Sequence, residues 1–254
     1  MEDKGTREIL QKLAGIVADN LARGVGKTEV IDAVCAHTGM PRGQAEAFVG
    51  RIDRQVNSPM ARKEDFAKFF REGEKIKLHI GCGEVRLPGW INVDQVTDAA
   101  DVHHDMRHPL PLDAGSVDYI FNEHFLEHLK AADGVALLKE FLRVLKPGGV
   151  LRIAVPDLES LVLSYSGDWK SIHGGWMNKY GYGFIRTRAE LLNVCFRTWG
   201  HEYLYDEEEL GRRLAEAGFS RIKRERHRES SREDLRGLET READQSNLIV
   251  EAEK

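Results

Sequence analysis

Apolar side chains recur every three or four positions in the first part of the chain, residues 1–72. This spacing places them along one face of a helix. The pattern predicts a first helix at about 9–21, a second at about 30–34, and a third that begins near Pro41, where a first-turn proline is tolerated. Phenylalanines within 66–70 indicate a short fourth helix. Residues 1–72 are therefore expected to form an all-helical accessory or cap domain.

From residue 75 onward, short apolar runs alternate with turns and helical segments. The runs are typical of strands and cover 76–81, 90–94, 101–104, 117–122, 149–155, 220–227 and 247–252. Helices are expected at 132–146 and 206–217, and a charged, turn-like stretch at 228–246. Strands that alternate with helices predict an α/β domain over 75–254, with a mostly parallel sheet.

Composition and charge exclude a few classes of protein. The chain has 254 residues, of which 41% are hydrophobic and 31% charged, as in ordinary globular proteins. No apolar run is long enough to span a membrane, and the N-terminus, MEDKGTREIL, lacks the apolar segment of a signal peptide. Three widely spaced cysteines indicate a reducing compartment rather than a disulfide framework. We therefore expect a cytoplasmic protein with no membrane partner, and the net charge of -5 excludes a globally basic nucleic-acid binder.

A pair of glycines after an apolar run is the strongest local signal. The run 78–80 leads directly into Gly81 and Gly83, and glycine lets the backbone turn sharply and lets a ligand approach the main chain. Asp94 ends the next expected strand and Asp105 follows the third. Because open α/β sheets bind ligands at the carboxyl ends of their strands, we expect a ligand site at this edge. Asp94 is placed for a ribose and Asp105 for an adenine.

Five segments in this order and spacing resemble class I S-adenosylmethionine-dependent methyltransferases, in the branch called methyltransferase type 11. The segments are HIGCG (79–83), GWINVD (89–94), HDMRHPLPLDAGSVDYIF (104–121), EHFLEHL (123–129) and LRVLKPGGVLRIAVPD (142–157). The resemblance implies a Rossmann-like sheet of seven strands, mostly parallel and with an antiparallel last strand. It also implies S-adenosylmethionine as the cofactor, held by Gly81, Cys82, Gly83, Asp94, Gln95, Asp105, Met106 and Asn122.

Two connections are shorter than the resemblance implies. Residues 84–89 join the first two strands and 95–100 join the next two, whereas a parallel crossover normally needs about a dozen residues. Two helices that would cover the sheet are therefore expected to be missing, both from one face. Because a parallel sheet does not leave an apolar face in water, the helices of 1–72 are expected to cover that face instead.

His124 is the candidate catalytic residue. It follows the fourth strand, where the resemblance implies that the acceptor meets the methyl group, and a neutral imidazole can act there as a general base. Residues 124–128 also match HxxEH, the inverted motif of zinc proteases. Because the motif directly follows a strand in a methyltransferase-like sheet, we expect no metal site and assign His128 to substrate binding.

Aromatic residues, glycines and histidines are concentrated in 164–205, a segment that the resemblance implies is a substrate-side insertion. Aromatic faces with polar tips suit sugars or flat rings, and they equally suit a dimer interface or a lid. Trp176, His201 and Tyr203 are the further candidates for substrate binding.

These features predict methyl transfer from S-adenosylmethionine to a small molecule or a sugar, at an oxygen atom. The predicted enzyme is a methyltransferase whose acceptor is not a nucleic acid, and the formation of a homo-oligomer is left open. The alternative is a non-catalytic regulator or assembly protein that binds the cofactor and docks a partner through its helical domain. Cofactor binding without methyl transfer would favour that alternative.

Overall fold

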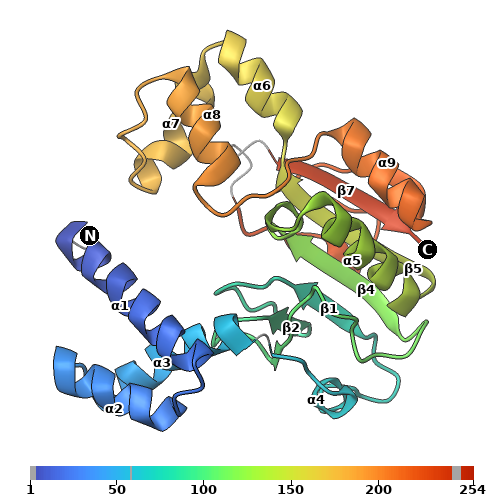
Figure 1. The fold of residues 1–254 in the computed structure, drawn as a ribbon. Helices are drawn as coiled ribbons and strands as arrows, with labels where there is room; N and C mark the ends of the chain where they lie inside the picture. Colours follow the sequence, from blue (N-terminus) through green and yellow to red (C-terminus); the bar gives the residue numbers. More distant parts are fainter. Residues whose placement is uncertain (1–3, 58, 242–246) are drawn as a thin grey trace.

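One seven-stranded sheet organises the computed structural model, which describes residues 4–57, 59–241 and 247–254. Its strands are β1 (Lys77–Ile80), β2 (Ile91–Asp94), β3 (Val102–His103), β4 (Val117–Glu123), β5 (Leu145–Pro156), β6 (Ser220–Arg224) and β7 (Asn247–Glu253). They lie in the order β3-β2-β1-β4-β5-β7-β6, and β7 runs antiparallel to both neighbours while the other pairs are parallel (Figure 1). The predicted Rossmann-like sheet with an antiparallel last strand is confirmed. The end of the turn-like stretch predicted at 228–246 lies outside the described residues, as do the first three residues.

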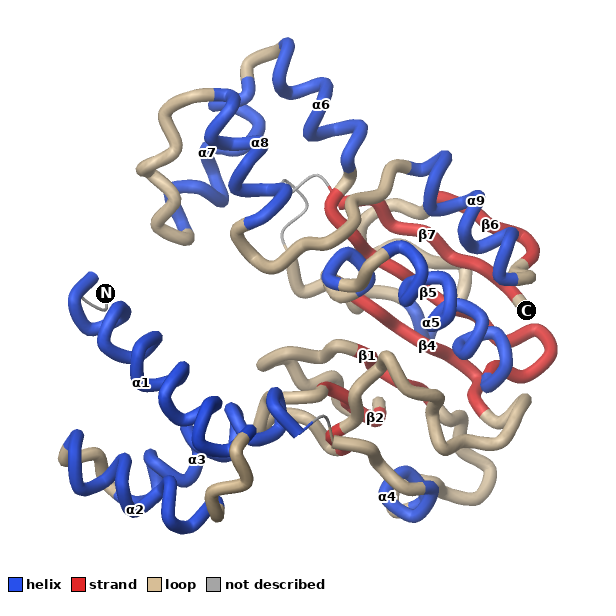
Figure 2. The backbone as a smooth tube through the Cα atoms, viewed as in Figure 1, coloured by secondary structure: helices blue, strands red, loops and turns tan. Residues whose placement is uncertain are grey.

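Helices account for most of the remaining chain (Figure 2). They are α1 (Lys4–Ala22), α2 (Lys27–Thr38), α3 (Arg42–Asn57), α4 (Lys63–Ala67), α5 (Ala131–Val144), α6 (Leu158–Ser166), α7 (Trp169–Lys179), α8 (Arg188–Arg197) and α9 (Glu207–Ala217), with single turns η1 (Leu126–His128) and η2 (Glu233–Leu235). Helices α5 and α9 match the two predicted in the second part of the chain, whereas no element was predicted where α6–α8 form. In the part of the chain that the structure describes, no helix combines the length and apolar character that a membrane crossing needs. The cytoplasmic location stays a prediction.

The first three helices form a core of their own. Their buried side chains, among them Val17, Val30 and Val49, pack together in a cluster separate from that of the sheet. The apolar stripe predicted for α1 is covered near its C-terminal end, where Val17 is 1% exposed, but Ile9 and Ile16 are 68% and 60% exposed. The division into a helical domain and a methyltransferase domain near residues 72–75 stays a prediction.

Helices cover one face of the sheet. The apolar sides of α5 and α9, which follow β4 and β5, pack on the strands in the main core, where Phe141 and Leu214 are fully buried. The short α4 joins the same core through Phe66, which is also fully buried. Burial of this apolar surface stabilises the sheet and so holds its strand ends in place.

The opposite face lacks the two crossover helices, as the short connections predicted. Turns and irregular chain join β1 to β2 and β2 to β3. In the strand order, the connections from β1 to β2 and from β2 to β3 both move in one direction along the sheet, whereas the connection from β4 to β5, which contains α5, moves in the other. Right-handed crossovers that move in opposite directions along a sheet lie on opposite faces. Both missing helices therefore belong to the face opposite α5, which confirms that they are lost from one face.

A segment near the C-terminus, residues 225–241, covers this face. Its Leu235 and Leu238 pack in one apolar cluster with Trp90, which precedes β2, and with Phe121 of β4. The expectation that the helices of 1–72 take this place is wrong for α1–α3, because their buried side chains pack on one another instead.

A buried arginine fixes residues 225–241 to the sheet. Arg152 of β5 is fully buried, and its guanidinium lies 2.6 Å from both Glu239 Oε1 and Glu251 Oε1. A buried charge is tolerated when it is paired and hydrogen-bonded in this way. Glu123, at the end of β4, accepts a hydrogen bond from Arg241 N at 3.2 Å. These contacts bring Arg241 to the carboxyl end of the sheet.

Candidate active site

Two glycines turn the chain at the carboxyl end of β1. Both have left-handed backbone, with φ of 68° at Gly81 and 53° at Gly83. A Cβ atom on Gly81 would lie 2.4 Å from the Phe125 ring, whereas no described atom lies within 4 Å of the equivalent position on Gly83. Gly83 N donates a hydrogen bond to Asp94 Oδ2 at 3.1 Å. The structure thus brings the glycine turn and Asp94 together and leaves the main chain open at Gly83.

The side chains of Asp94 and Gln95 point to different partners. Asp94 Oδ1 accepts hydrogen bonds from Val96 N at 2.8 Å and Thr97 N at 3.2 Å, which fix the carboxylate at the strand end. Gln95 Nε2 instead donates to the carbonyl oxygen of Arg54 in α3 at 3.3 Å. Gln95 therefore links the strand end to the helical region, and its contact with the cofactor stays a prediction.

Asp105 and Met106, both predicted to contact the cofactor, are buried. The Asp105 carboxylate is 2% exposed and is paired with Arg107, whose Nη2 lies 2.5 Å from Oδ2. Asp105 N donates to the carbonyl oxygen of Pro59 at 2.9 Å. Met106 belongs to the main core. The adenine contact assigned to this pair stays a prediction.

Cys82 and Asn122 complete the set of predicted cofactor residues. Cys82 is buried, and burial raises the pKa of its thiol to about 12, so it packs as a neutral group. Asn122 is fully buried and donates from Nδ2 to the carbonyl oxygen of Ile80 at 3.1 Å, but its Oδ1 accepts no hydrogen bond from any described residue. An orphaned buried acceptor beside an open glycine turn fits a bound cofactor, which would supply the missing donor.

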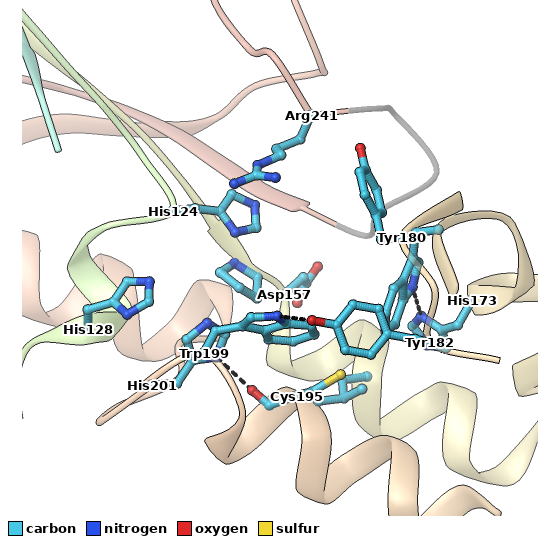
Figure 3. A pocket seen from close by; sticks show the side chains of 13 residues that line it. His124, His128, Asp157, His173, Tyr180, Tyr182, Cys195, Trp199, His201 and Arg241 are labelled. Atoms are coloured by element: carbon cyan, nitrogen blue, oxygen red, sulfur yellow. Dashed lines mark hydrogen bonds between the residues drawn. The ribbon is translucent and has the colours of Figure 1, made fainter. Parts of the chain in front are cut away.

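A cavity of about 550 Å³ opens beyond β4 and β5, against α6–α8 (Figure 3). We call it the histidine cavity, and its lining residues are His124, His128, Pro156, Asp157, Leu161, His173, Trp176, Tyr180, Tyr182, Cys195, Trp199, His201 and Arg241. His124, His128, Trp176 and His201, four of the predicted catalytic and substrate-binding residues, thus meet around one space. Tyr203 lies outside it, because its ring packs on the main core and its hydroxyl donates to Glu209 Oε1 at 2.9 Å.

His124 is held from three directions at the end of β4. Its backbone is left-handed, with φ of 50°, an uncommon conformation for a residue other than glycine. Its N donates to the carbonyl oxygen of Ala154 at 2.9 Å, and its Nε2 lies 2.9 Å from Asn247 Oδ1. Its Nδ1 lies 3.4 Å from Glu127 Oε1. The imidazole is therefore fixed at the wall of the histidine cavity.

Glu127 is a fully buried carboxylate among three imidazoles. His128 Nε2 and His201 Nε2 each lie 4.0 Å from Glu127 Oε1. Within the described ranges neither carboxylate oxygen receives a hydrogen bond. The arrangement differs from the HxxEH motif of zinc proteases, because η1 is a single turn and does not place His124 and His128 side by side on a helix.

Burial and the nearby charge act in opposite directions on His124 and Glu127. Burial lowers the pKa of the imidazole and raises that of the carboxyl, because each charged form loses water. Their mutual contact outweighs burial, so the pKa of His124 lies above its ordinary value and that of Glu127 lies below. Burial also lowers the pKa of His201. At neutral pH, Glu127 is therefore ionised and His201 is neutral.

Two charged residues of the cavity wall, Asp157 and Arg241, were not among the predicted site residues. Asp157 follows β5 and caps α6, where it accepts a hydrogen bond from Glu159 N at 3.1 Å, and it pairs with Arg224. Its place after a strand was a usable signal. Arg241 lies beside His124 in Figure 3, but its position depends on the long-range contact with Glu123 and leaves no local pattern in the sequence.

Residues 86–153 match the profile of a protein family described as a methyltransferase domain. A curated protein from Streptomyces fradiae, described as an uncharacterized 37.1 kDa protein in transposon TN4556, is 43% identical over 67 residues. The alignment covers 26% of this chain and 19% of that protein, so it spans about a fifth of the length of the relative.

Solved structures described as methyltransferases are among those similar to this chain. An S-adenosylmethionine-dependent methyltransferase from Archaeoglobus fulgidus is 17% identical, with a TM-score of 0.44 and coverage of 75% of this chain and 90% of that one. Another from Thermotoga maritima is 17% identical, with a TM-score of 0.43 and coverage of 74% and 86%.

The family match extends from β2 almost to the end of β5 and includes His124, Glu127 and His128. It therefore covers the strand ends that carry Asp94 and His124, whereas the glycine turn at 81–83 and most of the residues that line the histidine cavity lie outside the match. Residues 86–153 match a methyltransferase domain, and the predicted resemblance to class I methyltransferases of the type 11 branch, with S-adenosylmethionine as their cofactor, is confirmed.

Proposed function

We propose that this protein transfers a methyl group from S-adenosylmethionine to an oxygen atom of a small molecule or sugar bound in the histidine cavity. The observation that carries the proposal is the composition of that cavity. Its wall joins His124, at the end of β4, to the aromatic side chains of α7 and the chain around α8. A volume of about 550 Å³ lies within the range of small-molecule sites.

The aromatic wall supports a sugar or a flat ring as the acceptor. Trp176, Tyr182 and Trp199 pack edge to face, with ring centroids 5.3–5.9 Å apart. Trp199 Nε1 donates to the Tyr182 hydroxyl at 2.6 Å, which links two of the three rings. Aromatic faces beside polar groups suit sugars, whose apolar faces stack on rings while their hydroxyls form hydrogen bonds.

His124 is the proposed general base. S-adenosylmethionine supplies an electrophilic methyl group, and an attacking hydroxyl must lose its proton in or before the transfer. A proton on Nδ1, facing the Glu127 carboxylate, leaves the lone pair on Nε2 for the proton of the acceptor. In the resting protein, rotation of the Asn247 amide by half a turn would let its buried Nδ2, which has no partner in the described chain, donate to Nε2. An acceptor hydroxyl would take the place of that amide.

The test compares turnover with cofactor affinity in His124→Ala. We expect turnover to fall by about 10²–10⁴-fold, the usual effect of a lost general base, while the affinity for S-adenosylhomocysteine stays near that of the wild type. His37→Ala, on the exposed face of α2, is the control for removal of a histidine. Equal turnover in His124→Ala and His37→Ala would remove the base assignment.

A regulator that binds the cofactor without catalysis is the second candidate. The exposed Ile9 and Ile16 on α1 favour it, since an apolar helix face in water is a surface on which a partner can dock. Calorimetry with S-adenosylmethionine, followed by assays with a broad panel of acceptors, separates the two candidates. Cofactor binding without methyl transfer to any acceptor would favour the regulator.

A further inference from the structure

Glu127 lies 3.4 Å from His124, but the described residues leave its carboxylate without an aligned hydrogen-bond donor. The carboxylate is fully buried, and no N–H of the residues that the structure describes is aligned with either oxygen. Buried charges in proteins are paired or coordinate metals, because an unpaired buried charge opposes folding. The three imidazoles around Glu127 are nearby, but none of them forms an aligned hydrogen bond with it.

His201 presents a lone pair to this carboxylate. Its Nδ1 lies 2.6 Å from the carbonyl oxygen of Cys195, and because a carbonyl only accepts, Nδ1 must carry the proton. Nε2, which lies 4.0 Å from Glu127 Oε1, is then an acceptor that faces a second acceptor. A carbonyl partner on the far nitrogen is the usual way in which a metal-binding histidine is oriented. The space between the two acceptors suits a cation.

The main chain holds these groups in place. Glu202 N and Tyr203 N donate to the carbonyl oxygen of Glu127 at 2.8 Å and 3.1 Å, which ties the segment after α8 to η1. His128 joins from η1, with its ring centroid 5.0 Å from that of His201. One ligand atom from each of Glu127, His128 and His201 lies within 4.8 Å of the other two.

We propose that Glu127, His128 and His201 bind one divalent transition-metal ion, of the Zn²⁺ class, through one oxygen and two nitrogens. Two imidazoles and a carboxylate form a known ligand set for zinc, with a further position open. Ligand atoms in a tetrahedral zinc site lie about 3.4 Å apart, so the two 4.0 Å separations from Glu127 must close by about 0.6 Å, and the separation of the two imidazole nitrogens, which is at most 4.8 Å, by up to about 1.4 Å. His128, the most exposed of the three at 34%, has the most room to move toward the other two.

The open position would face the histidine cavity, since His128 and His201 both line it. An ion there would bind an acceptor oxygen and lower the pKa of a hydroxyl that reaches it. This role rests on the proposed function, whereas ion binding itself does not. The proposed ligands also differ from those of the HxxEH motif, whose two imidazoles would be His124 and His128, because His201 takes the place of His124.

The test measures metal binding by the protein alone. Protein treated with a chelator is titrated with Zn²⁺ by calorimetry, and Co²⁺ is added in parallel to record its visible absorption spectrum. We expect one ion per chain and a Co²⁺ spectrum of low coordination number. We expect binding to weaken by at least about tenfold in each of Glu127→Gln, His128→Ala and His201→Ala. Loss of a residue that only orients a metal ligand already weakens binding by about tenfold, and loss of a ligand should weaken it at least as much.

His37→Ala is the control for adventitious binding to an exposed histidine and should bind like the wild type. His128 is the most exposed ligand, at 34% against 0% for Glu127 and 5% for His201, so His128→Ala keeps the test valid if a buried variant misfolds. Absence of binding, or binding unchanged in His128→Ala, would overturn the proposal. S-adenosylhomocysteine titrated in the absence of metal tests cofactor binding separately, so failure of the metal site is distinguishable from failure of the proposed function.

Discussion

Gly81 and Gly83 have similar backbones but different surroundings, which decides what a substitution at each would report. A side chain on Gly81 collides with Phe125, so its replacement disturbs packing before it affects any ligand. Gly83 has free space beside it and a hydrogen bond to Asp94. Gly83 is therefore the residue at which approach of the cofactor to the main chain can be tested.

Gly83→Ala should weaken binding of S-adenosylhomocysteine by about tenfold or more, equivalent to one lost hydrogen bond of about 1.4 kcal/mol. The matched control is Gly148→Ala, which also has left-handed backbone, with φ of 77°, and open space in the described structure. Both variants should lose about 1–2 kcal/mol of stability through backbone strain. Calorimetry and urea unfolding measure the two effects, and equal affinities in both variants would show that the cofactor does not approach Gly83.

The site residues that could be predicted are those placed by their own strand or insertion. His124 follows β4 directly, and Trp176 and His201 belong to the aromatic insertion. The hydroxyl of Tyr203 is instead taken by Glu209, a partner in another element that no local pattern announces. Arg241 reaches the cavity through a similar long-range contact. The position of a residue in the chain predicts the strand end at which it lies. It does not predict which distant side chain forms a hydrogen bond with its polar group.

At the scale of elements, the length of the connections predicted which helices are missing, whereas the pattern of polar and apolar residues did not predict what replaces them. The short chains after β1 and β2 have too few residues for a helix, so the missing helices could be predicted by counting. Their replacement, residues 225–241, is attached by the buried Arg152 together with Glu239 and Glu251. This stretch is charged, and charged stretches usually lie at the solvated surface. Its sequence has no hydrophobic periodicity that would predict its packing against the sheet.

Helix α9 should contribute to the acid sensitivity of the fold through Glu209. Hydrogen bonds from Arg212, Arg213 and Tyr203 lower the pKa of this carboxyl from 4.5 to about 2. A depressed pKa stabilises the folded state above the unfolded pKa, and this contribution is lost as pH falls from about 4.5 toward 2. Glu209→Gln should therefore unfold at lower urea than the wild type at pH 7, and the difference should shrink below pH 4.5. Glu208→Gln, an exposed neighbour with the same charge change, is the control. A difference between Glu209→Gln and wild type that does not vary with pH would contradict this account.

At the scale of the whole molecule, the apolar core of α1–α3 is separate from the main core of the sheet, and the boundary between these two falls before α4. Phe66 of α4 is fully buried in the sheet core, Ala61 N donates to His104 Nδ1 at 3.1 Å, and Pro59 accepts from Asp105 N. Residues 59–72 therefore support the sheet, whereas α1–α3 pack on one another. Separate cores are expected to unfold as separate units.

Removal of residues 1–58 should leave a chain that unfolds cooperatively in urea, with most of its stability. Removal of 1–72 should cost more, because loss of a buried phenylalanine alone is worth about 3–5 kcal/mol. Circular dichroism during urea unfolding of the 59–254 and 73–254 chains measures the difference. Equal stability of the two shortened chains would contradict the placement of α4 in the sheet core.

The central claim is methyl transfer to an oxygen in the histidine cavity, and the most direct measurement identifies the methylated atom. The protein is incubated with S-adenosylmethionine labelled with ¹³C at the methyl group and with a panel of sugars and hydroxylated rings, and the products are examined by NMR. We predict a labelled methyl group on an acceptor oxygen, formed with an equal amount of S-adenosylhomocysteine and strongly reduced in His124→Ala. A label on carbon or nitrogen, or no labelled product from a protein that binds the cofactor, would contradict the claim.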